Sequence, residues 1–326
     1  MRRAGIVGTG SSVPERILSN EELERMVETS DEWIRTRTGM RERRIAAPGQ
    51  GASDLAVAAA RGALRAAELD ADKLELIIVA TFTPDRPLPA TACYVQRKLG
   101  ATNAAGFDLS IACTGFINAL MTADSLVAGG MFRNALVIGT EVMSSVTDYQ
   151  DRDSCVLFGD AAGAAVVGAD ASEGQILDHV VKIDGQGTEM ISIPSGGSAA
   201  PLTADRLEAR ENFLRLSGRQ VFKFAVNAIG DVVGEILLRN GYTIADVDLF
   251  VPHQANLRII EAAATRLGID MDRVIVNIDR YGNTSAASVP LALDEAASTG
   301  RLKRGDLVCL VAFGAGLSWG ATLLRW

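Results

Sequence analysis

The chain repeats its own pattern at an offset of about 170 residues, and this repeat constrains the fold more than any other feature. One copy begins at Asp72 and reads DKLELIIVATFTP; the other begins at Ala245 and reads ADVDLFVPHQAN. Each has an acidic turn, a short apolar strand and a polar loop. Each continues into a helical pattern that stops at a glycine, Gly100 or Gly268, which suits the left-handed conformation at a helix end. The repeat therefore predicts two related halves.

The correspondence continues along both halves. AAGFDLSIACTG aligns with VIVNIDRYGNTS, and GDAAGAAVVGA aligns with FGAGLSWGATLL. Each half is predicted to run strand, helix, strand, helix, strand, and the apolar runs lack polar alternation, which is typical of strands covered on both faces. Apolar residues become sparse between Gly168 and Gln175. We therefore expect halves at residues 1–172 and 173–326, packed as layered α/β units whose strand-to-helix loops converge.

Composition and charge exclude several classes of protein. The 326 residues are 48% hydrophobic with a formal net charge of -8, which fits a compact α/β protein but not a nucleic-acid binder rich in Lys and Arg. This charge still leaves room for a local basic patch. The apolar run in MRRAGIVGTGSS is too short for a signal peptide, and no run approaches membrane-spanning length. We therefore expect a cytoplasmic protein that does not bind nucleic acid or membranes.

Four cysteines are widely spaced and form no Cys-x-x-Cys pair, so neither a zinc site nor a disulfide framework is indicated. Cys113 lies where an apolar run in LSIACTGFINAL gives way to a helical pattern. A helix N-terminus carries about half a positive charge and free N–H groups, which favour a thiolate and could stabilise an oxyanion. Taken alone, such a cysteine is more often an inert core residue. We interpret Cys93, Cys155 and Cys309 as packing residues.

Two polar side chains of the second half could complete a site with Cys113. His253 follows a predicted strand in VPHQANLRI, and Asn283 lies near a helix start in RYGNTSAAS, at the place that we align with Cys113. A structural histidine and an asparagine N-cap are the simpler interpretations. A Cys–His pair across the junction of the halves would instead mark a catalytic site, with the amide donating to a substrate oxygen. The other histidine, His179, is predicted to be a strand residue.

The segment from Ile191 to Gln220 has no counterpart in the first half. It holds the loop IPSGGSAAP, followed by a predicted helix in ADRLEARENFLRLSGRQVFKF. This helix would carry five basic side chains: Arg206, Arg210, Arg215, Arg219 and Lys223. They form either a solvated charged face or a landing site for an anionic partner.

Four motifs together, IACTGF, VPHQANLRII, GNTSAAS and FGAGLSWG, resemble those of β-ketoacyl-acyl carrier protein synthase III, a condensing enzyme of the thiolase superfamily. The resemblance covers essentially the whole chain, since SDEWIRTRTGMRERR also looks like the N-terminal segment of that family. It implies a thiolase-like fold of two duplicated halves in a five-layered α-β-α-β-α sandwich, and a homodimer. It also implies the initiating condensation of fatty acid synthesis, with acyl-CoA and malonyl-acyl carrier protein as substrates and neither cofactor nor metal.

The same resemblance implies that Cys113, His253 and Asn283 form the catalytic set. Cys113 would take an acyl group from acyl-CoA, with the backbone N–H groups of Cys113 and Ala315 as oxyanion hole. His253 and Asn283 would then donate hydrogen bonds to the thioester carbonyl of malonyl-acyl carrier protein. Loss of CO2 would leave a carbanion that attacks the acyl-cysteine. Phe313 would keep the site dry, which favours decarboxylation over hydrolysis.

A binding site for CoA is implied as well. Trp33 and Arg152 would stack on the adenine, because guanidinium groups pack well on rings. Arg37 and Thr38 would lie near the phosphates. Asn256 would lie along the pantetheine arm.

Two further residues would contact protein partners. Leu88, in RPLPATAC, would reach into the acyl pocket of the partner subunit. Because leucine is smaller than an aromatic residue, we predict a pocket that accepts branched or medium primers as well as acetyl. Arg258, just after the catalytic loop, would dock the acidic carrier protein together with the basic helix, which reconciles such a partner with an acidic chain.

The chain departs from the family pattern at two more positions. Ala315 stands where many relatives carry glycine, so its backbone must avoid strongly positive φ or be strained. Arg219 stands where some relatives place an asparagine that lines the CoA channel. Two alternatives stay open: a type III polyketide synthase or other specialised acyltransferase, which extends with malonyl-CoA, and a non-catalytic acyl-CoA binder, against which the intact catalytic set weighs.

Overall fold

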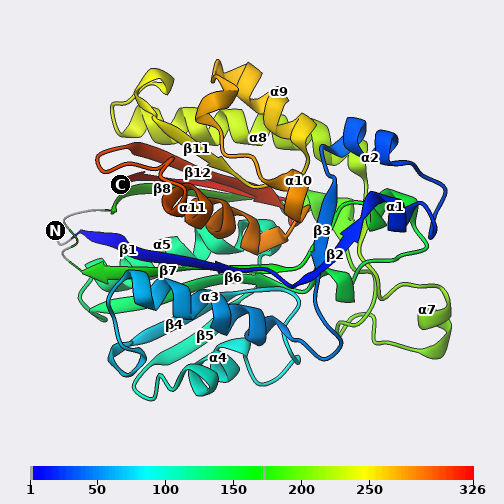
Figure 1. Cartoon of the computed structure of the whole chain (residues 1–326), viewed down its shortest axis with the longest axis horizontal. Coiled ribbons are helices and arrows are strands. Elements are labelled where there is room, and N and C mark those ends of the chain that lie inside the picture. The colour runs from blue at the N-terminus through cyan, green and yellow to red at the C-terminus, as the bar shows by residue number, and fades with distance from the viewer. Residues whose placement is uncertain (1–2, 170, 172–173) are drawn as a thin grey trace.

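The computed structural model describes residues 3–169, 171 and 174–326, and its largest sheet has nine strands in the order β11-β12-β13-β8-β1-β7-β6-β4-β5 (Figure 1). The strands are β1 (Ala4–Ser12), β4 (Leu76–Ala80), β5 (Ala105–Leu109), β6 (Asn134–Glu141), β7 (Ala161–Ala169), β8 (Gln175–Ile183), β11 (Leu249–Pro252), β12 (Leu307–Gly314) and β13 (Ser318–Arg325). At its centre β1 pairs with β8 through one residue pair, Gly5 with Gln175. The sheet therefore separates into two layers, which Figure 1 shows one above the other.

Six long helices form three further layers around the two sheet layers. They are α3 (Ala52–Ala66), α4 (Thr91–Leu99), α5 (Gly115–Ala128), α8 (Gly218–Arg239), α9 (Leu257–Leu267) and α11 (Ser288–Ser298). Figure 1 shows α8 and α9 outside one sheet layer, α3 and α4 outside the other, and α5 and α11 between the two. Three separate apolar cores match these layers, and the central core joins residues of both sheet layers to α5 and α11. The predicted five-layered α/β arrangement is confirmed.

Several short helices and strands lie outside these layers. They are β2 (Arg16–Ser19), α1 (Asn20–Leu23), α2 (Asp31–Thr38), β3 (Glu42–Ile45), α6 (Arg152–Cys155), β9 (Ile191–Ser192), α7 (Ala204–Glu208), β10 (Arg215–Leu216) and α10 (Ile278–Tyr281). The helix α2 begins at a capping serine, whose hydroxyl accepts from the N–H of Trp33, and ends at the left-handed Gly39. In the described part of the chain, no helix is long and apolar enough to cross a membrane.

The two halves repeat with a constant offset of 173 residues at their core, from 76 to 249 for β4 and β11 and from 134 to 307 for β6 and β12. The same offset relates two short turns, Ala112–Thr114 and Ser285–Ala287. The alignment of Asn283 with Cys113 is therefore wrong by three residues, because Ala286 takes the place of Cys113. The proposed boundary between residues 172 and 173 lies outside the described residues.

Two predicted elements are not formed as expected. VIVNI does not form a strand like β5, since Val274 makes only an isolated bridge with Phe250. The single basic helix is also wrong: this segment forms α7, β10 and the start of α8. The chain leaves the helix at Arg210, where φ is 57°, and the N–H of Leu214 donates to Val146 instead of to a helical carbonyl.

Glycines let the central helix α11 and the turn before it lie against the first sheet layer. A Cβ at Gly139 of β6 would lie 2.2 Å from the carbonyl oxygen of Ala286. A Cβ at Gly163 of β7 would lie 2.6 Å from the backbone nitrogen of Leu291. Since side chains do not tolerate such distances, these glycines allow the second half to bring its turn beside the turn that carries Cys113.

Candidate active site

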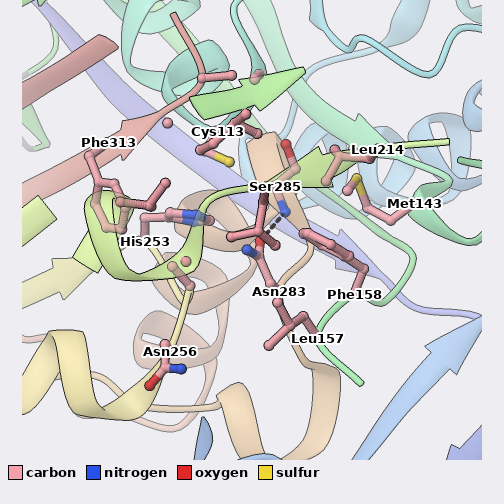
Figure 2. A pocket seen from close by; sticks show the side chains of 18 of the residues that line it. Cys113, Met143, Leu157, Phe158, Leu214, His253, Asn256, Asn283, Ser285 and Phe313 are labelled. Atoms are coloured by element: carbon pink, nitrogen blue, oxygen red, sulfur yellow. Dashed lines mark hydrogen bonds between the residues drawn. The ribbon is translucent and has the colours of Figure 1, made fainter. Parts of the chain in front are cut away.

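A cavity of about 870 Å³ opens where the two halves meet, and it brings the predicted catalytic residues together (Figure 2). Cys113 comes from the first half, and His253 and Asn283 come from the second. All three line the cavity, and Figure 2 shows their side chains pointing toward a common space. The convergence expected from the repeat is therefore present.

Cys113 lies in the turn Ala112–Thr114 that immediately precedes α5. Ala112 adopts the left-handed φ of 45°, which directs the half-buried Cys113 to the cavity. The strand β12 passes close by, because a Cβ on Gly314 would lie 2.8 Å from the Cβ of Cys113. The thiol thus lies between a helix start and the backbone of the other half.

Burial raises the pKa of the Cys113 thiol to about 12, and the carboxyl of Glu141 adds to the rise, while a hydrogen bond from Ser285 opposes it. Desolvation of the thiolate therefore opposes the lowering of the pKa that the helix N-terminus was expected to give. A thiol with so high a pKa is protonated at neutral pH.

His253 follows β11, where its N–H donates to Val311 of the neighbouring strand at 2.8 Å. Its side chain is 2% exposed, and its ring packs edge-to-face on Phe313 with 5.5 Å between the ring centroids. Burial lowers the pKa of His253 to about 3, so the imidazole is neutral at physiological pH. A neutral ring can donate one hydrogen bond and accept one.

A hydroxyl determines which nitrogen of His253 carries the hydrogen. Nδ1 lies 2.5 Å from Oγ of Ser288, the first residue of α11, and this oxygen also accepts from the N–H of Gln254 at 3.5 Å. We assign the hydroxyl hydrogen to the contact with Nδ1, and in this tautomer the imidazole hydrogen is on Nε2, toward the cavity. His253 therefore faces the cavity as a hydrogen-bond donor.

Asn283 is also oriented as a donor. Its Oδ1 accepts from the N–H of Ser285 at 2.9 Å, so the NH2 group is left for the cavity (Figure 2). Its backbone is held on both sides, since its N–H donates to Leu157 and its carbonyl accepts from Gly159. The simpler interpretation as a helix N-cap is not found; Thr284 precedes the turn 285–287.

The predicted oxyanion loop borders the same space. Gly314, Ala315 and Gly316 line the cavity beside Cys113. Ala315 does not adopt a positive φ, whereas Gly316 has a φ of 136°. Alanine at this position therefore causes no strain, which resolves the first departure from the family pattern.

Most of the residues predicted to bind CoA line the same cavity. Trp33, Arg37, Thr38 and Asn256 line it. Arg152 does not line it, but its guanidinium lies 5.1 Å from the ring centroid of Trp33. Asn256 bonds to the protein at both ends of its amide: Nδ2 donates to the carbonyl of Arg37 at 3.1 Å, and Oδ1 caps α9.

Apolar side chains line much of the remaining cavity. They are Phe82, Met143, Phe158, Ile191, Ile193, Leu214, Leu216 and Phe222. Arg219, the second departure, lies among them at the start of α8 and also lines the cavity. Such a lining suits an acyl chain or a pantetheine arm more than a charged ligand.

Comparison with known proteins gives the family. Two sequence models match, "3-Oxoacyl-[acyl-carrier-protein (ACP)] synthase III" over residues 107–185 and its C-terminal counterpart over residues 237–326. A protein of Caldanaerobacter subterraneus named beta-ketoacyl-[acyl-carrier-protein] synthase III is 52% identical over 99% of this chain and 98% of its own. The chain belongs to the β-ketoacyl-acyl carrier protein synthase III family.

Solved structures agree with this family. A synthase III from Aquifex aeolicus is 45% identical with a TM-score of 0.92, over 99% of this chain and 100% of that one. A priming β-ketosynthase from the R1128 polyketide pathway is 40% identical with a TM-score of 0.91, over 99% of this chain and 97% of that one. The predicted thiolase-like fold and condensing acyltransferase are confirmed, and the type III polyketide synthase and non-catalytic alternatives receive no support.

Two residues that the synthase III resemblance assigned to partners lie away from the cavity. Leu88 is 83% exposed on the loop between β4 and α4, and it does not line the cavity of its own chain. Arg258 is exposed in the first turn of α9, outside the cavity. Both positions leave these side chains available to other molecules.

The remaining predictions have mixed outcomes. Cys155 and Cys309 are buried, as expected, but Cys93 is exposed on α4, so its interpretation as a packing residue is wrong. Cys93 does lie in a helix, as predicted, but on its exposed face. His179 lies in β8, as predicted. Among the described residues, no cluster of three or more His, Cys, Asp or Glu side chains could hold a metal.

The basic segment is less basic than its sequence indicates. Arg210 pairs with Asp148, and Arg206 pairs with Glu211 at 3.6 Å. Because these side chains lie on different elements and are partly neutralised, they do not form the single landing face that a continuous helix would give.

Sequence reasoning missed three polar residues around the site. Ser288 orients His253, Ser285 contacts Cys113, and Glu141 lies buried behind Ser285. Ser285 and Ser288 lie within the motif GNTSAAS, so the motif itself was the signal for them. An acidic residue at the end of the apolar run NALVIGTE was the signal for Glu141.

Proposed function

We propose that this synthase III transfers an acyl group from acyl-CoA to Cys113 and condenses it with malonyl-acyl carrier protein, which yields β-ketoacyl-acyl carrier protein and CO2. The observation that supports this most is the convergence of Cys113, His253 and Asn283 on one cavity. Their hydrogen-bond partners direct a sulfur and two neutral donors to the same space. This arrangement suits a thioester that is first attacked and then polarised.

In the first step the sulfur of Cys113 attacks the thioester carbonyl of acyl-CoA. The backbone N–H groups of Cys113 and Ala315 stabilise the oxyanion. The S–C bond to CoA then breaks and leaves acyl-Cys113, while the CoA thiolate takes a proton from solvent. Because the pKa of the Cys113 thiol is raised to about 12, removal of its proton must accompany the attack.

In the second step Nε2–H of His253 and the NH2 of Asn283 donate to the thioester oxygen of malonyl-acyl carrier protein. CO2 leaves, and these donors stabilise the enolate-like carbanion, which attacks acyl-Cys113 and releases the sulfur. Burial suits this step, because it keeps His253 neutral and keeps water away from the carbanion. Phe313 contributes by covering the imidazole ring.

Acyl-CoA enters beside Trp33, Arg37 and Thr38, which line the cavity. In this proposal Trp33 and Arg152 hold the adenine, Arg37 and Thr38 lie by the phosphates, and Asn256 borders the pantetheine arm. Arg152 already packs over Trp33, so the adenine has to enter between them. The proposed reaction uses no cofactor, and we place it in the cytoplasm with its CoA and carrier-protein substrates.

We further propose a homodimer in which Leu88 of each subunit reaches the acyl pocket of the other. Its 83% exposure leaves this side chain free to contact a second subunit. A leucine leaves more room than an aromatic residue, so branched and medium primers should be accepted as well as acetyl. Leu88→Phe should narrow the range to acetyl, which a primer panel measures.

Carrier-protein docking is proposed at Arg258. Arg258→Glu should raise KM for malonyl-acyl carrier protein about tenfold and leave acyl transfer from acyl-CoA unchanged. Arg65→Glu is the matched control, because Arg65 is an exposed arginine on α3, in the opposite outer layer. An unchanged rate with Arg258→Glu would remove this docking site from the proposal.

The function itself is tested with a primer panel and malonyl-acyl carrier protein, in which wild type is compared with Cys113→Ser. Wild type should form β-ketoacyl-acyl carrier protein from acyl-CoA primers, and the variant should not. Formation of β-ketoacyl-acyl carrier protein by Cys113→Ser would contradict the mechanism. Extension with malonyl-CoA, without any carrier protein, would instead favour a polyketide-synthase-like reaction.

A further inference from the structure

A buried carboxyl that has no part in the chemistry above lies behind the nucleophile. Glu141 is the last residue of β6 and is fully buried. No cation contacts it among the described residues; instead, hydroxyl and N–H groups surround it. An uncompensated carboxyl is costly to bury, so its position beside the site calls for an explanation.

One carboxyl oxygen of Glu141, Oε2, accepts most of the hydrogen bonds. Oε2 accepts from Thr83 Oγ1 at 2.5 Å, from Thr81 Oγ1 at 3.1 Å, and from backbone N–H groups of residues 82 and 83. Both hydroxyls donate to Oε2, and each also accepts an N–H from elsewhere: Thr81 Oγ1 from Thr83 and Thr83 Oγ1 from Val142. Oε1 accepts fewer hydrogen bonds, from Ser285 Oγ at 3.2 Å and from the N–H of Phe82 at 3.4 Å, so we assign a proton on Glu141 to Oε1.

That second oxygen, Oε1, connects Glu141 to Cys113. Ser285 Oγ lies 3.2 Å from Oε1, and Ser285 also lies beside Cys113 in the cavity, where its hydroxyl lowers the pKa of the thiol. Ser285 has one hydroxyl hydrogen, so it donates either to the carboxylate or to the sulfur. When it donates to Glu141, its oxygen is free to accept the thiol hydrogen; when Glu141 is protonated, the hydroxyl donates to the thiolate.

The imidazole is the poorer proton acceptor of the two neighbours. Nδ1 of His253 is engaged by Ser288, and burial lowers the pKa of His253 to about 3. Burial raises the pKa of Glu141 to about 7, and the hydrogen bonds from Thr83 and its neighbours oppose the rise. The carboxylate is thus the stronger base at neutral pH.

The groups that face Glu141 come from three elements. The loop after β4 gives the two threonines and two N–H groups, the turn 285–287 gives Ser285, and the turn before α5 gives Cys113. Cys113 is the titratable group among these neighbours, and the charge of Glu141 raises the pKa of its thiol.

We propose that Glu141 is a positioning residue that holds the Cys113 proton, through Ser285, while the acyl group is bound. As the sulfur attacks, the S–H bond breaks and its proton passes to Ser285 Oγ, whose own proton passes to Oε1 of Glu141. When the carbanion displaces the sulfur, the same two transfers run in reverse and restore the thiol. The inference rests on the proposed role of Cys113.

Ser285→Ala offers a narrow test of this path. It removes the hydroxyl but keeps the backbone N–H that orients Asn283. Glu141→Gln keeps the shape of Glu141 but cannot take up the proton. Asp160→Asn is a matched control, because Asp160 is another fully buried carboxyl with a raised pKa, bonded to Ser144 and the N–H of Ala46 instead.

The readout is the rate at which iodoacetamide alkylates Cys113 between pH 5.5 and pH 9, beside the rate of acyl-Cys113 formation. In wild type and Asp160→Asn the alkylation rate should rise with a group of pKa about 7. In Glu141→Gln and Ser285→Ala this rise should disappear, and both rates at pH 7.5 should fall about tenfold or more. The double variant should be no slower than either single one. Decarboxylation of malonyl-acyl carrier protein should stay within about threefold in both variants, because its two donors are intact.

An unchanged pH profile in either variant would overturn the proposal, and if Glu141→Gln does not fold, Ser285→Ala decides alone. If Glu141 has a purely structural role, Glu141→Gln should lower stability but keep the rise of the alkylation rate near pH 7. That result would also contradict the proposal. Acyl mass on wild-type Cys113 keeps the two hypotheses apart. Its absence would refute the proposed function, whereas acylation with an unchanged variant profile would refute this inference alone.

Discussion

The two halves place different chemistry at equivalent positions. Residues 173 apart occupy the same places in the two sets of strand-to-helix connections: Ala80 and His253, Ser110 and Asn283, Cys113 and Ala286, Gly115 and Ser288. Even the backbone is repeated, because Ala112 and Ser285 both adopt a left-handed φ, 45° and 50°. The duplication therefore preserved the turns while the side chains diverged.

The difference shows how one scaffold separates two tasks. In the first half a Cβ on Gly115 would lie 2.9 Å from the Cβ of Ala80, which leaves no room for a polar pair. In the second half the equivalent residues, Ser288 and His253, form the hydrogen bond that orients the imidazole. In the proposed reaction, the first half supplies the nucleophile and the second half supplies the donors.

Making the two turns alike should have the largest effect. Cys113→Ala gives the first turn the alanine that the second turn has at Ala286. Condensation should fall by about a thousandfold or more, because no other side chain replaces the sulfur. The measurement is formation of β-ketoacyl-acyl carrier protein. Cys93→Ala, on the exposed face of α4, is the control and should leave the rate unchanged.

Removing a donor from the second half should affect only one of the two steps. Asn283→Ala should lower condensation roughly a hundredfold, because one of two neutral donors to the carbanion is lost. The burst of CoA released on acylation should stay within about threefold of wild type. Rapid-quench measurement of the burst and of steady-state turnover separates the steps. Equal losses in both would contradict the division of tasks between the halves.

The close approach of the second turn to strand β6 can be tested through stability. Gly139→Ala would place a Cβ 2.2 Å from the carbonyl of Ala286, so the backbone must move, at a cost of about 2–3 kcal/mol in the free energy of unfolding. Gly234→Ala in α8 meets no atom within 4 Å and should stabilise by about 0.5–1 kcal/mol. Urea titration measures both, and equal stability of the two variants would refute the close approach.

A further effect concerns pH. The pKa of His253 is lowered from 6.5 to about 3 by burial, so between these values the unfolded chain holds a proton that the folded chain lacks. Its contribution to stability is therefore complete above pH 6.5 and is lost as the pH falls toward 3. Wild type should lose up to about 1.4 kcal/mol more per pH unit than His253→Gln between pH 6 and pH 4. If the free energies of unfolding of wild type and His253→Gln, measured by urea titration, change in parallel with pH, His253 is not desolvated.

Local sequence patterns predicted those features that local chemistry determines. The repeat predicted the layers, and the motifs around Cys113, His253 and Asn283 predicted which loops meet. The apolar run VIVNI is long enough for a strand, but the sequence does not show that it makes only one bridge, between Val274 and Phe250. The predicted basic helix is wrong for a similar reason, because the N–H of Leu214 donates to the distant carbonyl of Val146 and not to a carbonyl of the same helix.

Electrostatic balance was the least predictable feature. A helix N-terminus is visible in sequence, but the burial that raises the pKa of Cys113 depends on the packing of Gly314 and its neighbours. The same holds for Glu141, whose donors come from a loop about 60 residues away in the chain. Tertiary contacts, which no motif encodes, set these values.

The account depends most on the claim that the sulfur of the first half accepts the acyl group. Incubation with acyl-CoA, followed by digestion and mass spectrometry, tests it directly. We predict one acyl group on the peptide that contains Cys113, none in Cys113→Ala, and continued acylation in Asn283→Ala. Acyl mass on another peptide, or on none, would contradict the account.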